Sequence, residues 1–164
     1  MAGTNKFTQK AKRVLSVAQQ EAETEHAREI GSEHLLLGLC IETGTAANRV
    51  LEDLGVGTDS VRSVLKELRG KQEPNENIPS VLGEDLKRLL EQALAESVAD
   101  KATTVGTEHL ILAISRDENS MAMRILAALG ITSEQVQRQT NRIMDEYKQM
   151  QDVAKKLESS DDLE

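Results

Sequence analysis

The sequence predicts an all-α protein built from two four-helix units. The segment Gly31–Leu35 (GSEHL) returns 75 residues later as Gly106–Leu110 (GTEHL). The same offset aligns residues over roughly sixty positions, which indicates two copies of one structural unit. Apolar residues recur at intervals of three and four, the spacing of a buried helix face. Aromatic residues make up only 1% of the chain, so aliphatic side chains must form the core.

Four helices are predicted in the first unit, residues 7–69. Thr8 is expected to be the N-cap of the first helix, Ser32 the cap of a short apolar second helix, and Thr58 the cap of the fourth. A glycine follows the third helix, as is common at helix C-termini. The residues expected to face the core include Phe7, Ala11, Val14, Leu15, Ala18, Ala22, Val50, Leu51, Leu54, Val61, Val64, Leu65 and Leu68.

A linker is expected over residues 70–80. This stretch holds both prolines of the chain and two asparagines, and it has no apolar periodicity. The second unit, residues 81–145, repeats the helix pattern of the first. Thr107 is expected to cap its second helix, and Gly130 follows its third.

The last helix is predicted to continue past the repeat to about Leu157, within a C-terminal extension over residues 146–164. Its apolar positions form a heptad seam of about three repeats, near the threshold for a coiled coil. One alternative is a helix that packs back on its own domain, and the other is a helix for a partner or for self-association. Ser159–Glu164 is expected to be an acidic, disordered tail. The seam consists of Val136, Thr140, Ile143, Tyr147, Met150, Ala154 and Leu157.

Charge and cysteine content exclude several classes of function. A net charge of −8 argues against nucleic-acid binding, which needs clustered Lys and Arg, and against an anionic membrane surface. The single cysteine, Cys40, has no partner for an internal disulfide. No apolar signal core or membrane-length apolar run occurs in the sequence. We therefore expect a cytoplasmic protein, or a protein of the plastid stroma if the source is a plant.

These motifs resemble the Clp N-terminal repeat, and two tandem copies resemble the N-domain of ClpC-type chaperones. The evidence is the doubled Gly-[Ser/Thr]-Glu-His-Leu motif at matched spacing, together with Gly44–Ala47 (GTAA) and Val50–Gly55 (VLEDLG). The resemblance implies one domain over residues 1–164, an eight-helix array with pseudo-twofold symmetry. It implies no enzymatic activity and no cofactor.

The resemblance also implies protein partners: adaptors, substrates, or the subunits of a Clp ATPase or protease. The chain contains no Gly-x-x-x-x-Gly-Lys-[Ser/Thr] motif for binding nucleotide phosphates. Two forms are therefore open, a stand-alone accessory protein and the excised N-terminal domain of a ClpC-type AAA+ unfoldase. A third alternative is a stand-alone protein that binds or sequesters a small molecule.

For site residues, the resemblance implies binding of phosphorylated arginine. The glutamate of each motif, Glu33 and Glu108, would bind the guanidinium. The phosphate would bind at the start of the first helix, where Thr8 lies in the first copy. In the second copy Gly83 takes the place of this threonine, and two acidic residues follow it. We therefore expect a site in the first copy and an impaired site in the second. Alternatively, both glutamates only stabilise the dipoles of their helices.

No catalytic or metal-binding residues are predicted. His34 and His109 each follow a glutamate, but adjacent helical side chains point apart by about 100° and no ligand stands four residues on. We expect both histidines to be partly buried and to fix the loop before their helix. Ser32 lies near His34, yet the sequence lacks the Gly-x-Ser-x-Gly motif of a hydrolase nucleophile.

Overall fold

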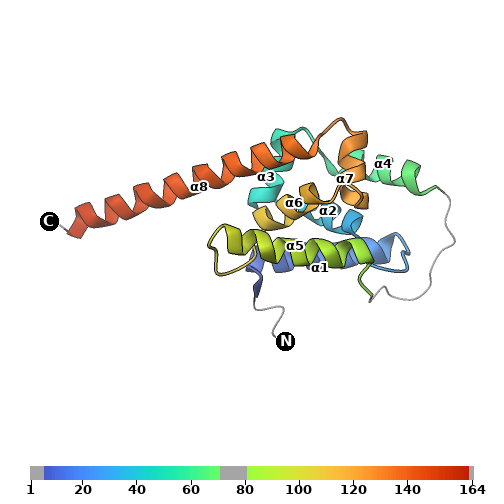
Figure 1. Ribbon diagram of the computed structural model, residues 1–164, viewed down its shortest axis with the longest axis horizontal. Coiled ribbons are helices and arrows are strands. Elements are labelled where there is room, and N and C mark those ends of the chain that lie inside the picture. The colour runs from blue at the N-terminus through green and yellow to red at the C-terminus, as the bar shows by residue number, and fades with distance from the viewer. Residues whose placement is uncertain (1–5, 71–80, 163–164) are drawn as a thin grey trace.

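The computed structural model describes residues 6–70 and 81–162, with side chains to residue 159. Helices and the loops that connect them make up this part of the chain. The all-α prediction is confirmed. Figure 1 shows a body of packed helices from which the last helix projects. The helices are α1 (Gln9–Thr24), α2 (Ser32–Ile41), α3 (Ala46–Asp53), α4 (Thr58–Arg69), α5 (Glu84–Ala99), α6 (Thr107–Arg116), α7 (Met121–Ala128) and α8 (Ser133–Asp162).

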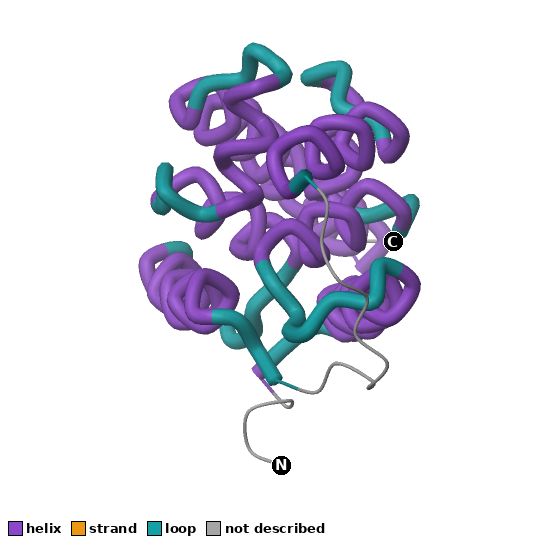
Figure 2. Tube along the Cα trace, turned by 90° about the vertical axis from the view of Figure 1, so that its right-hand side faces the viewer, coloured by secondary structure: helices purple, strands orange, loops and turns teal. Residues whose placement is uncertain are grey.

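The two repeats exchange the short segments that precede their first helices. Phe7 forms a parallel β-bridge with Val105, and Leu82 forms the equivalent bridge with Ile30. The backbone N–H of Thr8 donates to the Val105 carbonyl at 2.9 Å. Figure 2 shows α1 and α5 at opposite sides of the molecule near one edge, and the loops that carry the two bridges cross between these helices. Because each segment pairs with the other repeat, α1 begins beside the start of α6, and α5 begins beside the start of α2.

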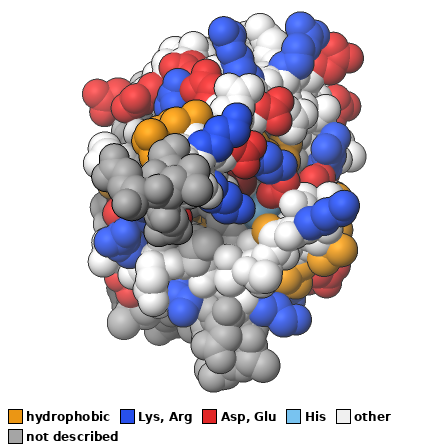
Figure 3. Space-filling view, turned by 90° about the vertical axis from the view of Figure 1, so that its left-hand side faces the viewer, with side chains coloured by type: hydrophobic (Ala, Val, Ile, Leu, Met, Phe, Trp, Pro, Cys, Tyr) orange, Lys and Arg blue, Asp and Glu red, His pale blue; other side chains and the backbone are white. Residues whose placement is uncertain are grey.

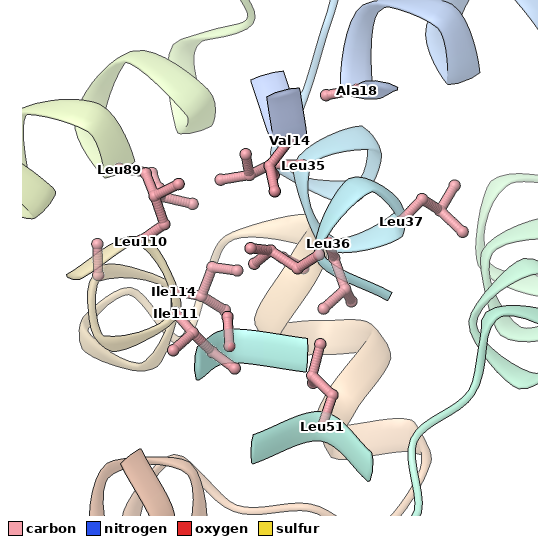
Figure 4. Packing of buried hydrophobic residues seen from close by; sticks show 14 of the residues in the cluster. Val14, Ala18, Leu35, Leu36, Leu37, Leu51, Leu89, Leu110, Ile111 and Ile114 are labelled. Carbon is pink, nitrogen blue, oxygen red and sulfur yellow. The ribbon is translucent and has the colours of Figure 1, made fainter. Parts of the chain in front are cut away.

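The core lies around α2 and α6, which are buried on nearly every side. Leu35, Leu36, Leu110 and Ile111 are all fully buried, and Figure 4 shows how the aliphatic side chains of both repeats meet there. Full burial of such a side chain contributes about 1.5–3 kcal/mol. The two repeats therefore share one hydrophobic core.

Helix starts differ from the prediction at three of the expected caps. Thr8 caps α1 as expected, and its Oγ1 accepts from the Ala11 N–H at 3.1 Å. The cap predictions for Ser32, Thr58 and Thr107 are wrong, because each of these residues is the first helical residue and a glycine occupies the cap position. The hydroxyls of Ser32 and Thr107 instead reach other helices.

The seam of α8 divides into two parts. Val136, Thr140 and Ile143 are buried against the body of the protein. Beyond residue 147 the helix projects into solvent (Figure 1), and Met150 and Leu157 are 65% and 62% exposed. The helix therefore packs on its own domain only along its first half.

The ends of the predicted elements also differ from the expectation. Residues 159–162 continue α8, so the expectation of a disordered tail is wrong for them, and residues 163–164 lie outside the described part. Of the predicted linker, Gly70 is the C-cap of α4, and residues 71–80 lie outside the described part. No helix among the described residues is both long enough and apolar enough to cross a membrane.

Candidate functional site

At one end of the molecule, the carboxylate of Glu33 is paired within the chain. Glu33 lies in the first turn of α2 and is only 8% exposed. Arg69, the last residue of α4, forms ion pairs with Glu33 through Nη2 and with Glu25 through Nη1. Burial alone would raise the pKa of Glu25, but the hydrogen bond from His34 and the charge of Arg69 hold it below its usual value.

The starts of three helices meet at the same end, and one carboxylate connects them. Asp85, in the first turn of α5, accepts from the Ser32 hydroxyl at 2.5 Å and from the Ser32 N–H at 3.1 Å. It also accepts from the N–H of Met121, the first residue of α7, at 3.1 Å. Burial would raise the pKa of Asp85, but these hydrogen bonds hold it below its usual value. An internal anion therefore occupies the position between these helix starts.

The opposite end has the same backbone arrangement with different side chains. Glu108 lies in the first turn of α6, and its side chain is 25% exposed. The position equivalent to Arg69 is Met144, and the position equivalent to Asp85 is Lys10. Among the described residues, the carboxylate of Glu108 lies 3.9 Å from Nδ1 of His109, but this nitrogen accepts the Gly106 N–H and so does not form an ion pair with Glu108. Figure 3 looks onto the molecule from this end and shows acidic and basic side chains around a hollow.

The structure combines the predicted site residues differently from the sequence expectation. Thr8 lies beside the start of α6, because its N–H is bonded to Val105, three residues before Glu108. Glu33 lies at the far end of α1, whose sixteen residues span about 24 Å. The expected pairing of Thr8 with Glu33 is therefore wrong. Each end of the molecule is built from both repeats.

Sequence reasoning missed Arg69, and it assigned Asp85 to the site of Glu108 although Asp85 lies at the end of the molecule that holds Glu33. Both are ordinary charged residues at helix ends, and their partners are distant in sequence. A signal was present in the repeat itself, because the two positions change from Arg to Met and from Asp to Lys between the copies. A charge that differs between equivalent positions marks the places where the two ends differ chemically.

The two histidines hold the loops before α2 and α6, as expected, but both are buried and not partly buried. The N–H of Gly31 donates to Nδ1 of His34, and the N–H of Gly106 donates to Nδ1 of His109, both at 2.9 Å. Each Nε2 therefore carries the proton and donates to a carboxylate that lies nine residues earlier in the chain. Within residues 6–70 and 81–162, no three His, Cys, Asp or Glu side chains gather in a way that could hold a metal ion.

Comparison with protein families agrees with this doubled architecture. The model of the Clp repeat (R) N-terminal domain matches residues 6–120 and again residues 81–164. The chain belongs to the Clp repeat N-terminal domain family. The double match of this Clp domain covers both copies of the repeat and the described part of α8.

Known relatives carry the Clp domain as a small part of a long chain. The ClpC/MecB negative regulator of genetic competence of Bacillus subtilis is 31% identical over 140 residues, which are 85% of this chain and 17% of the relative. The N-terminal domain of the chaperone ClpD of Arabidopsis thaliana superposes with a TM-score of 0.68 at 20% identity, over 85% of this chain and 98% of that one. A ClpV N-domain in complex with a VipB peptide superposes with a TM-score of 0.67 at 18% identity, over 88% and 90% of the two chains.

Proposed function

We propose that this chain is a docking domain of a Clp chaperone–protease system that binds segments of adaptor or substrate proteins. Its open site would take an arginine side chain phosphorylated on the guanidinium, held between Glu108 and the start of α1. The observation that carries this proposal is the part-exposed carboxylate of Glu108 at the same end as the α1 N-terminus. The peptide bound to a ClpV N-domain supports protein segments as the class of ligand.

The chemistry of the two groups fits a phosphorylated guanidinium. A carboxylate such as Glu108 accepts charge-assisted hydrogen bonds from a guanidinium. The first turn of α1 offers backbone N–H groups ahead of the helix ladder, and the helix dipole favours an anion there. Lys10 adds a positive charge in that turn, with its Nζ bonded to the Gly44 carbonyl at 2.9 Å. The guanidinium of the ligand would thus meet the negative charge of Glu108, and its phosphate would meet the positive charge of Lys10 and of the helix start.

The proposal assigns binding rather than catalysis to the chain. The chain spans 17% of the length of the Bacillus relative, so the ATPase activity of a longer Clp chaperone would lie outside the matched part. A stand-alone accessory protein and the N-domain of an unfoldase would share this docking role. Capture of a Clp ATPase by the purified chain would support it. A thermal shift with a small molecule and no Clp partner would favour the alternative of a small-molecule-binding protein.

Calorimetric titration with a peptide that contains one phosphoarginine tests the site. The wild-type chain should bind, and Glu108→Gln should weaken binding at least tenfold because a neutral amide loses the charge-assisted pair. Glu134→Gln provides the matched control, since Glu134 is an exposed glutamate in the first turn of α8. Equal affinities of wild type and Glu108→Gln would contradict the proposed site.

We also propose that the outer part of α8 associates with a second copy of the chain. The exposed apolar residues Met150 and Leu157 favour this, because they continue the seam that is buried nearer the body, and Val153 is a further exposed apolar residue on this part of the helix. Light scattering should give the mass of a dimer for the full chain and the mass of a monomer for a chain that ends at Gln149. That truncation keeps Lys148, whose Nζ donates to Asp100 at 2.9 Å. Two monomeric masses would contradict self-association.

A further inference from the structure

We infer that Arg69 occupies the Glu33 position as a built-in guanidinium, so that the domain has one open arginine site instead of two. The assignment of Arg69 stands on the geometry alone. The conclusion of a single open site rests on the function proposed above for the Glu108 end. Arg69 would therefore set how many arginine side chains one molecule binds.

The guanidinium of Arg69 makes the contacts that we expect of a bound guanidinium ligand. The side chain of Arg69 is 12% exposed, and its two terminal nitrogens bond to the carboxylates of Glu25, the C-cap of α1, and Glu33, in the first turn of α2. A guanidinium presents a fixed planar set of donors, which suits it to bridge Glu25 and Glu33. An external arginine would have to displace this internal one from both carboxylates.

The anion half of the same site is also filled. Asp85 accepts three hydrogen bonds at the starts of α2 and α7, where an external phosphate would need the same N–H donors. A phosphate placed there would also meet a carboxylate of the same charge. The chain thus supplies its own substitute for the guanidinium and for the anion.

The equivalent positions at the other end show that side chains, not the backbone, make the difference. Met144 is half-buried and carries no charge, so Glu108 has no arginine partner among the described residues. Lys10 is exposed and basic, and it stands where Asp85 stands in the other repeat. One fold therefore carries one filled site and one open site.

Space is present beside Arg69, so the site is closed by pairing and not by lack of room. A cavity of about 850 Å³ is lined by Arg69 and Glu33, with Arg28 and Met121 on other walls. Removal of the Arg69 side chain would extend this cavity towards Glu33. A small guanidinium compound should then reach the carboxylates that Arg69 now occupies.

Chemical rescue tests the assignment of Arg69. The Arg69→Ala chain should melt several degrees below wild type, and millimolar ethylguanidinium should recover part of that loss because it binds only the folded state. Ethylammonium, which lacks the planar donors, should recover less. Arg62→Ala is the matched control, since Arg62 also lies on α4 and pairs with Glu21 at 2.6 Å but is half exposed. Equal shifts with both cations, or in both variants, would overturn the assignment.

Stoichiometry tests the single open site. Titration of wild type with phosphoarginine should give one binding event per chain, and Glu108→Gln should remove it. Two binding events in wild type would overturn the inference. A wild type that binds no phosphoarginine would instead refute the proposed function, and ethylguanidinium rescue would then decide the role of Arg69.

Discussion

Replacing Asp85 with alanine tests whether one carboxylate connects the two repeats. Asp85 belongs to the second repeat, and its oxygens accept from the N–H and hydroxyl of Ser32 in the first. It also accepts from the N–H of Met121 at the start of α7. The Ser32 hydroxyl in turn accepts from the Ala122 N–H at 2.9 Å. Alanine would remove the acceptor for all three donors at once.

The expected cost follows from these three hydrogen bonds. A hydrogen bond contributes about 1 kcal/mol, and one to a charged group contributes about 1.5–3 kcal/mol. Asp85 is half-buried, so water would compensate part of the loss. We expect Asp85→Ala to lower the free energy of unfolding by about 3 kcal/mol, or the melting temperature by roughly 6–12 °C for a chain of this size.

Urea unfolding followed by circular dichroism at the helix band measures this change. Glu84→Ala is the matched control, because Glu84 lies in the same turn of α5 and its side chain is 81% exposed. Its ion pair with Lys87 should contribute about 0–0.5 kcal/mol. A loss below about 1 kcal/mol in Asp85→Ala would refute the reasoning, because the donors would then be finding other acceptors.

Two further predictions concern packing and pH. Gly38→Ala should destabilise the fold by about 1–3 kcal/mol, because the new Cβ would lie 2.7 Å from the Val14 carbonyl oxygen; urea unfolding within about 0.5 kcal/mol of wild type would contradict this. Stability should fall on acidification: burial would raise the pKa values of Glu25 and Asp100, but their hydrogen bonds to His and basic side chains hold them lower. Carboxylates with lowered pKa values stabilise the fold above their unfolded values of 4.5 and 3.8 and lose this effect as the pH falls. A urea midpoint that stays constant from pH 7 to about pH 3 would count against it.

The sequence by itself determined the helices and the core. The spacing of Ala11, Val14 and Ala18 defines one buried face of α1, and all three are at most 1% exposed. The 75-residue offset identified two equivalent units, and the two histidines of the motif make equivalent hydrogen bonds. Helix periodicity is a local feature, because it depends on residues three and four positions apart.

The tertiary structure alone decided which of the charged residues lie together. The bridge between Phe7 and Val105 joins segments 98 residues apart, and it places Thr8 beside α6 and away from α2. No local pattern encodes that exchange, because the same repeat could pair with itself or with its neighbour. Arg69 likewise reaches Glu33 only because the end of α4 packs near the start of α2. Charges meet through long-range packing, and because Met144 stands where Arg69 stands in the other repeat, Glu108 has no arginine partner among the described residues.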